Sequence, residues 1–166
     1  AKSMFSEAYD LLKQLDQEFR GKADFEMIVG KTMSGLAISY RNLGDFDSAE
    51  KAARRAVEAN MEVNKQTPET AGAMCTYADI MTDMHKYEKA EDFYMRSIGI
   101  WNGLVKEDKE DLRYQLERNI CRNNFATLLG QKGNFEAAIK ETKRSILFEL
   151  SFYGDNNMNL TMNYDN

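Results

Sequence analysis

The sequence predicts an all-α fold, an α–α superhelix built as a right-handed solenoid of antiparallel helix pairs. The first observation is an aromatic residue three positions before an alanine, which occurs four times, at Phe5/Ala8, Phe46/Ala49, Tyr87/Ala90 and Phe135/Ala138. The second is that these alanines recur after 41, 41 and 48 residues, a period at which repeated helical units stack on their neighbours. The third is the scarcity of helix breakers, one proline and ten glycines in 166 residues.

Composition narrows the class of protein further. The 166 residues are enough for one domain with a substantial core, and 43% hydrophobic with 30% charged residues argues against disorder. A net charge of −5 argues against a nucleic-acid surface, which needs clustered Lys and Arg. No apolar run approaches the ~18 residues of a membrane span, and no signal-peptide pattern opens the chain. We therefore expect a cytoplasmic protein that binds neither nucleic acid nor membrane.

Small residues keep the same spacing within three successive units. Intervals of 12 and 7 residues separate the members of each set, which are Ala37, Ala49 and Ala56; Ala78, Ala90 and Ser97; and Ala126, Ala138 and Ser145. Small side chains are needed where two helix backbones cross closely, so we expect the helices to cross at these positions. This register predicts one repeat domain over 1–166, with a partial unit at 1–24, full units at about 26–64, 68–106 and 109–153, and the start of another at 156–166.

The turn between the two helices of a unit also repeats. Gly44 and Gly133 follow the first helix at the position of a left-handed C-cap. Asp45 or Asn134 comes next and can cap the second helix. In the middle unit His85 occupies the glycine position. We expect that turn to be strained or differently shaped, because positive φ is unfavourable for a non-glycine residue.

These positions together resemble the tetratricopeptide repeat, a pair of antiparallel helices, over nearly the whole chain. The resemblance is carried by Leu36-Ala37, Tyr40, Gly44, Phe46, Ala49 and Ala56, and again by Phe125-Ala126, Gly133, Phe135, Ala138 and Ser145. The 41-residue period is similar to the longer unit of kinesin light chains, as are Arg122-Asn123-Asn124-Phe125-Ala126, Tyr153-Gly154-Asp155, Leu160 and Tyr164-Asp165-Asn166. The first two units depart from that subfamily, with Ser34-Gly35 and Cys75-Thr76 where asparagines would stand.

The third unit is longer than the others. From Ala56 to Ala78 there are 22 residues, whereas from Ser97 to Ala126 there are 29, and the extra seven fall in a charged segment around 101–118. Seven residues are almost two helical turns, so they lengthen helices without rotating the buried face. We expect one helix over 109–131 whose charged leading end is a solvated protrusion, with a docking spur as the alternative.

Neither end of the sequence looks like the polar cap that closes a repeat array. The chain begins in the second helix of a unit and ends just before the next unit's small residue would occur. We therefore expect a fragment of a longer array, with Met4, Phe5, Tyr9 and Leu12 facing a missing neighbour helix.

The residues offer little support for catalysis or metal binding. His85 is the one histidine and has no cysteine or second histidine near it, so a metal site fails on ligand number and a Ser–His–Asp triad is not supported. No glycine-rich phosphate loop is present. Cys75 and Cys121 lie in different units, which favours reduced thiols over a disulfide. Asp79 and Asp83, four residues apart, are typical of a solvated helix face. We expect no enzyme activity, no cofactor and no metal.

A binding surface follows from the geometry of stacked helix pairs, in which first helices line the concave side and second helices the convex side. First-helix residues that do not pack recur every three or four residues and point into the groove. The groove candidates are Lys31, Ser34, Ile38, Arg41 and Asn42 in the first full unit, Cys75, Thr76, Asp79, Thr82 and Asp83 in the second, and Asn123, Asn124, Thr127 and Gln131 in the third.

Two of these candidates have alternative roles. Asn124 can donate to and accept from an extended peptide backbone, as Asn166 can if the resemblance to kinesin light chains holds, or it can brace a neighbouring loop. Arg41 can pair with an acidic ligand or with Asp79 or Asp83 of the next unit.

The sequence therefore predicts a protein–protein interaction module, an adaptor or scaffold, that binds a peptide or partner helix in its concave groove. The carboxylate clamp of chaperone-binding family members is absent, because its five positions hold Ser34, Ile38, Thr76, Ile120 and Asn124. One alternative is a structural array that self-associates through exposed ends at Met4–Leu12 and Leu160–Tyr164. The other is a regulatory domain of a larger enzyme or transcription regulator.

Overall fold

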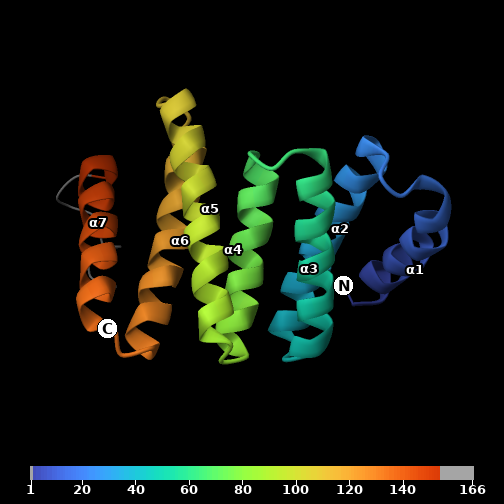
Figure 1. Ribbon diagram of the computed structural model, residues 1–166, viewed down its shortest axis with the longest axis horizontal. Helices are drawn as coiled ribbons and strands as arrows, with labels where there is room; N and C mark the ends of the chain where they lie inside the picture. The colour runs from blue at the N-terminus through green and yellow to red at the C-terminus, as the bar shows by residue number, and fades with distance from the viewer. Residues whose placement is uncertain (1, 154–166) are drawn as a thin grey trace.

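The computed structural model describes residues 2–153, which form an all-α superhelix, as the sequence predicts. Within this range seven helices stand in a row, with α1 at one end and α7 at the other (Figure 1). They are α1 (Lys2–Phe19), α2 (Ala23–Asn42), α3 (Phe46–Val63), α4 (Pro68–Asp83), α5 (Tyr87–Glu107), α6 (Leu112–Gln131) and α7 (Phe135–Tyr153). The expected start of a further unit at 156–166, including Leu160–Tyr164 and Asn166, lies outside the described residues.

Each helix packs on the next one along the chain. The pairs α2/α3, α4/α5 and α6/α7 are the units, and α3 with α4 and α5 with α6 join one unit to the next. The first helices also touch each other directly, α2 with α4 and α4 with α6. This second set of contacts places the three first helices side by side along one surface.

The repeated small residues lie at the helix crossings. Eight of the nine are buried, namely Ala37, Ala49, Ala56, Ala78, Ala90, Ser97, Ala126 and Ser145, and Ala138 is half-buried. Where serine replaces alanine in the second unit, the Ser97 hydroxyl donates to the Ala71 carbonyl oxygen at 2.8 Å. The buried hydroxyl therefore has a partner, as a buried polar group requires.

The three turns inside the units have one shape. In each, the N–H of the third residue beyond the helix donates to a carbonyl five residues earlier: Asp45 to Tyr40 at 3.0 Å, Lys86 to Met81 at 2.8 Å and Asn134 to Leu129 at 2.9 Å. The residue between has positive φ, +75° at Gly44, +57° at His85 and +78° at Gly133. His85 does adopt the unfavourable conformation, but the expectation of a different turn shape is wrong.

The two second-helix caps that the sequence predicts, at Asp45 and Asn134, are both present. The carboxylate of Asp45 accepts from the Ser48 N–H at 3.2 Å, and the side-chain oxygen of Asn134 accepts from the Ala137 N–H at 3.3 Å. At the start of α5 Lys86 provides no side-chain cap.

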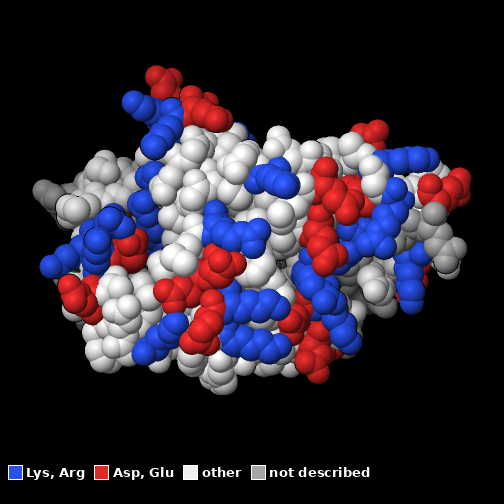
Figure 2. Space-filling view, in the orientation of Figure 1, with Lys and Arg blue, Asp and Glu red and all other residues white. Residues whose placement is uncertain are grey.

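The long third unit forms the protrusion that its charged segment predicts. Helix α5 extends to Glu107 and the exposed residues 106–110 stand above the neighbouring turns (Figures 1 and 2). Helix α6 begins at Leu112, three residues later than the predicted start at 109, because Asp111 caps it by accepting from the Arg113 N–H at 2.9 Å.

The α6/α7 pair is more polar inside than the first two pairs. Four residues before the small residue of the first helix, units one and two have buried Met33 and Met74, whereas unit three has Arg122. Among the described residues, four buried side-chain atoms of this pair have no hydrogen-bond partner: Arg118 Nε, Asn119 Oδ1, Arg122 Nε and Ser145 Oγ. Each buried polar atom that lacks a partner lowers the stability of the fold at this end of the array.

Helix α1 packs against the array more closely than expected. Leu12 is buried in the common core, and Leu15 and Phe19 pack against that core. The rings of Phe19 and Phe25 lie 6.1 Å apart between centroids. Leu12 therefore does not face an empty position, which corrects the sequence expectation, whereas Tyr9 is exposed. The side chains of Met4 and Phe5 lie outside the described residues.

The positive φ at His85 generates a test of backbone strain. We expect His85→Gly to raise the free energy of unfolding by about 0.5 kcal/mol, since glycine adopts this conformation without a Cβ clash. His85→Val should lower it by about 1 kcal/mol, because a β-branched residue is least tolerant of positive φ. Urea denaturation followed by circular dichroism measures both. A glycine variant less stable than the valine variant would contradict the assignment of strain.

The crossing of α2 and α3 generates a second test, because a Cβ on Gly30 would lie 2.3 Å from Asn60 Oδ1. We expect Gly30→Ala to destabilise the fold by about 1–2 kcal/mol despite the better helix propensity of alanine. Adding Asn60→Ala should recover most of that loss in a double-mutant cycle.

The matched control for this clash is Gly99→Ala in α5, where the new Cβ meets nothing within 4 Å. We expect this change to stabilise the fold by up to about 1 kcal/mol. Equal effects of the two alanine substitutions on the urea midpoint would refute the close approach.

Candidate functional site

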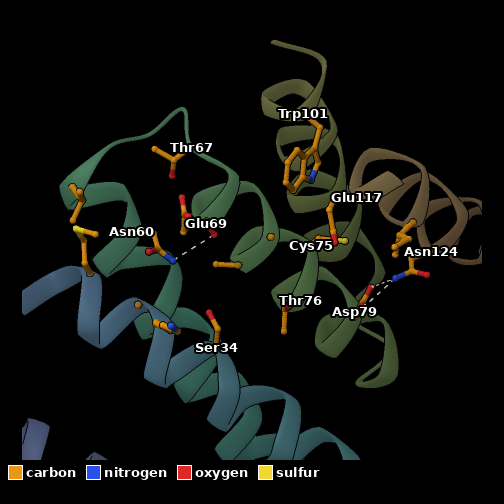
Figure 3. A pocket seen from close by; sticks show the side chains of 17 residues that line it. Ser34, Asn60, Thr67, Glu69, Cys75, Thr76, Asp79, Trp101, Glu117 and Asn124 are labelled. Carbon is orange, nitrogen blue, oxygen red and sulfur yellow. Dashed lines mark hydrogen bonds between the residues drawn. The ribbon is translucent and has the colours of Figure 1, made fainter. Parts of the chain in front are cut away.

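A cavity of about 740 Å³ opens along the surface formed by the three first helices (Figure 3). We call it the groove cavity. Its walls include Lys31 and Ser34 of α2, Thr76 and Asp79 of α4, and Ile120 and Asn124 of α6. The three units therefore contribute to one continuous hollow.

The fourteen groove candidates divide into three groups. Six line the groove cavity: Lys31, Ser34, Cys75, Thr76, Asp79 and Asn124. Five line a separate hollow of about 570 Å³ near the turns: Arg41, Asn42, Thr82, Asp83 and Gln131. Ile38, Asn123 and Thr127 line neither of these two hollows.

Two threonines among the candidates are engaged by their own helices. Thr82 is largely buried at the wall of the hollow near the turns, and its hydroxyl donates to the Ala78 carbonyl oxygen at 2.9 Å, so that hydroxyl is engaged within α4. The hydroxyl of Thr127 is exposed and donates to the Asn123 carbonyl oxygen at 3.1 Å.

Asp79 is the polar centre of the groove. Its carboxylate accepts from the Tyr94 hydroxyl of α5, from Arg41 Nη1 of α2 at 3.3 Å and from Asn124 Nδ2 of α6 at 3.0 Å. The Asp79 side chain is only 14% exposed. A single carboxylate on α4 thus receives donors from three other helices, which sets the spacing of the first helices across the groove.

These contacts bear on the alternatives for Arg41 and Asn124. Arg41 pairs with Asp79 and also with Asp83, the neighbour pairing that the sequence allows. The Asn124 amide nitrogen donates to Asp79 and so joins α6 to α4, while the side chain still lines the groove cavity, and its contact with a peptide backbone stays a prediction. The expectation of a solvated Asp79 is wrong.

The buried acid changes the proton affinities around it. Burial raises the pKa of Asp79, and the hydrogen bonds from Tyr94 and Asn124 with the charge of Arg41 offset this only in part. Burial, together with the Asp79 charge, also raises the pKa of Tyr94, whose hydroxyl therefore remains a donor at neutral pH.

The two cysteines meet beside the groove although they come from different units. Both are free thiols. The neighbouring Cys121 thiol and burial raise the pKa of the Cys75 thiol well above its usual range, which favours its unreactive thiol form. The Cys121 thiol donates to the Ser97 hydroxyl at 3.3 Å.

Several residues of the groove cavity were not predicted from the sequence. Second helices contribute Asn60, Val63 and Trp101, which corrects the assignment of these helices to the convex side alone. First helices add Met27, Gly30, Glu69, Gly72, Ala73, Glu117 and Ile120, and Thr67 comes from the loop before α4.

The repeat spacing in the sequence could have identified some of these residues. Lys31, Gly72 and Ile120 each stand six positions before the small residue of their first helix. Glu69 and Glu117 stand nine positions before it. Applying the predicted position of Lys31 to every unit would have found Gly72 and Ile120, whereas no predicted position corresponds to Glu69 and Glu117. In the described part of the chain, no group of three or more His, Cys, Asp and Glu residues is arranged to hold a metal ion, and no helix there has the length and apolar character of a bilayer crossing.

Comparisons with known proteins agree with the helical-repeat fold. Residues 29–102 match the tetratricopeptide repeat family. Among solved structures, the chain is similar to the crystal structure of BtubC (BKLC) from P. vanneervenii, with a TM-score of 0.69 and 21% sequence identity, over 99% of this chain and 61% of that chain. The chain thus spans about three fifths of that protein's length, and the likeness shows the fold alone. No curated protein matches the sequence.

The contribution of the Asp79 contacts to the stability of the fold can be tested by mutation. We expect Asp79→Ala to lower the free energy of unfolding by about 3 kcal/mol, because it leaves the buried Tyr94 hydroxyl without its acceptor and removes one of the two carboxylates that pair with Arg41. The matched control is Asp83→Ala, whose side chain is 32% exposed and should cost under about 1 kcal/mol. Chemical denaturation measures both, and equal losses would show that Asp79 is not the centre.

Proposed function

We propose that this protein is an interaction module that holds an extended peptide or a partner helix in the groove cavity and acts as an adaptor or scaffold. The observation that supports it is the cavity itself, about 740 Å³ and shared by three units. Tetratricopeptide repeats generally mediate protein–protein interaction, and residues 29–102 match that family. The proposal includes a cytoplasmic location and the absence of a catalytic role.

The groove cavity combines the features that ligand sites need. Met27 and Ile120 present exposed apolar side chains from α2 and α6, which can bury apolar groups of a ligand. Ser34 and Thr76 add hydroxyl groups that can donate to or accept from a peptide backbone. Because the Asp79 contacts hold α2, α4 and α6 together, the cavity is formed before a ligand arrives, which lowers the entropic cost of binding.

The experiment selects ligands from a random dodecapeptide display library on the purified protein and measures the Kd of the enriched peptides by titration calorimetry. We expect Ile120→Asp to weaken binding roughly tenfold or more, because a buried apolar contact worth about 1.4 kcal/mol or more is lost. Ile120 is 51% exposed in the groove cavity.

The matched control is Met95→Asp on α5, a side chain 53% exposed that does not line the groove cavity. It should leave Kd unchanged within twofold, and circular dichroism should show equal helicity for both variants. Failure of the library to enrich any peptide over a blank surface, or equal losses for both variants, would refute the proposal.

A second candidate is the self-associating array, favoured by one observation on α7. Phe135 is 67% exposed and Ile139, one turn later, is also exposed. Two neighbouring apolar side chains of this kind can dock a second copy. This candidate requires a mass that rises with concentration in light scattering and falls to that of the monomer in Phe135→Glu. The regulatory-domain alternative is compatible with either candidate.

A further inference from the structure

At one end the groove cavity joins a further hollow of about 440 Å³, distinct from the hollow near the turns. The groove cavity and this hollow share Glu69, Gly72, Trp101 and Glu117. We call this junction, with Tyr114, the Trp101 subsite. Figure 3 shows Trp101 at the upper end of the cavity, above Glu117, with Glu69 on the opposite wall. The subsite is therefore a continuation of the groove rather than a separate depression.

The floor of the subsite is aromatic. Trp101 is only 3% exposed, but it lines both hollows, and its ring centroid lies 6.0 Å from that of Tyr114. The indole N–H makes no hydrogen bond within the described residues and is not among their fully buried polar atoms without a partner, so solvent reaches it. At Gly72 an added Cβ would meet nothing within 4 Å, so the space beside the rings is open.

The rim of the subsite is negative. Glu69 on α4 and Glu117 on α6 occupy the same position in successive units, and both are exposed. Within the described residues, neither has a Lys or Arg at salt-bridge distance. The cation of the adjoining hollow, Arg113, is already held by Asp111, with Nη2 2.7 Å from Oδ2. Lys31 also lines the groove cavity but forms no ion pair with Glu69 or Glu117, so the two carboxylates face the cavity without a directly paired cation.

We propose that the Trp101 subsite binds an arginine or lysine side chain of the ligand, so that the partner segment is basic; this inference rests on the proposed peptide binding. A guanidinium or ammonium group placed over the indole is attracted by the face of the ring. The carboxylates of Glu69 and Glu117 accept its N–H donors in charge-assisted hydrogen bonds. The indole N–H donates to a carbonyl oxygen of the ligand. An acidic segment would instead meet two like charges.

The test uses the peptides enriched from the dodecapeptide library, each compared with a form in which arginine is replaced by neutral citrulline and lysine by norleucine. We expect enrichment of arginine and lysine, and roughly tenfold weaker binding for the neutral forms. Trp101 is the one tryptophan of the chain, so peptide binding should change its fluorescence and the titration reports directly on the subsite.

Two variants probe the subsite without touching the core. Gly72→Leu fills the open space beside the rings, and Glu117→Gln removes one carboxylate at constant size. Each should weaken a basic peptide at least fivefold. Their matched controls are Gly99→Leu, on an exposed glycine of α5 that also has open space, and Glu58→Gln, on an exposed carboxylate of α3 outside both hollows. Both controls should stay within twofold, with unchanged helicity.

The outcomes separate this inference from the proposed function. The library could instead enrich acidic or neutral peptides. If Ile120→Asp weakens their binding while Gly72→Leu and Glu117→Gln leave it unchanged, the cationic subsite is overturned and groove binding still stands. Enrichment of no peptide at all overturns both. Basic peptides that bind without a change in Trp101 fluorescence, or that bind Glu117→Gln unchanged, also overturn the subsite.

Discussion

Close contact between helix backbones at buried alanines and serines is the constraint on which this structure depends. Ala37, Ala49, Ala78 and Ala90 have no exposed surface, and a larger side chain at any of them would separate the crossing helices. Gly30 shows the same limit, since even a Cβ would overlap Asn60. Because each crossing recurs at nearly the same interval, helix pairs stack in one direction, and their first helices come to lie along a common surface.

The groove on that surface needs more than helix stacking. Stacked alanines bring α2, α4 and α6 together, but the Asp79 carboxylate joins them by accepting from Arg41, Tyr94 and Asn124. The N–H and O–H groups that make these contacts are then committed to the scaffold. What remains for a ligand is the apolar and hydroxyl lining of the groove cavity and, at its end, the aromatic and acidic Trp101 subsite. Structural and binding roles are thereby divided between neighbouring residues of the same helices.

The other surfaces of the array are electrostatically balanced. Glu50 of α3 pairs with Lys86 and Lys89 of the next unit, and Lys132 pairs with Glu91 across the following junction. Figure 2 shows positive and negative side chains interspersed over the face in view. Among the described carboxylates that have no ion pair, Glu69 and Glu117 line both the groove cavity and the hollow beside it, which is why charge points to a basic ligand at that end.

Local sequence determined the helix pairs, the small residues at their crossings and the turns, including the positive φ at His85. All of these depend on side-chain size and backbone preference within one unit, which spacing along the chain reveals. Only the tertiary structure decided that Asp79 is buried, that Asn124 donates to it, that Cys75 and Cys121 of different units are neighbours, and that Trp101 of a second helix reaches the groove. Those facts depend on which residues of different units meet, and the angle between successive units sets this. That angle arises from all the contacts together, so no single repeat encodes it.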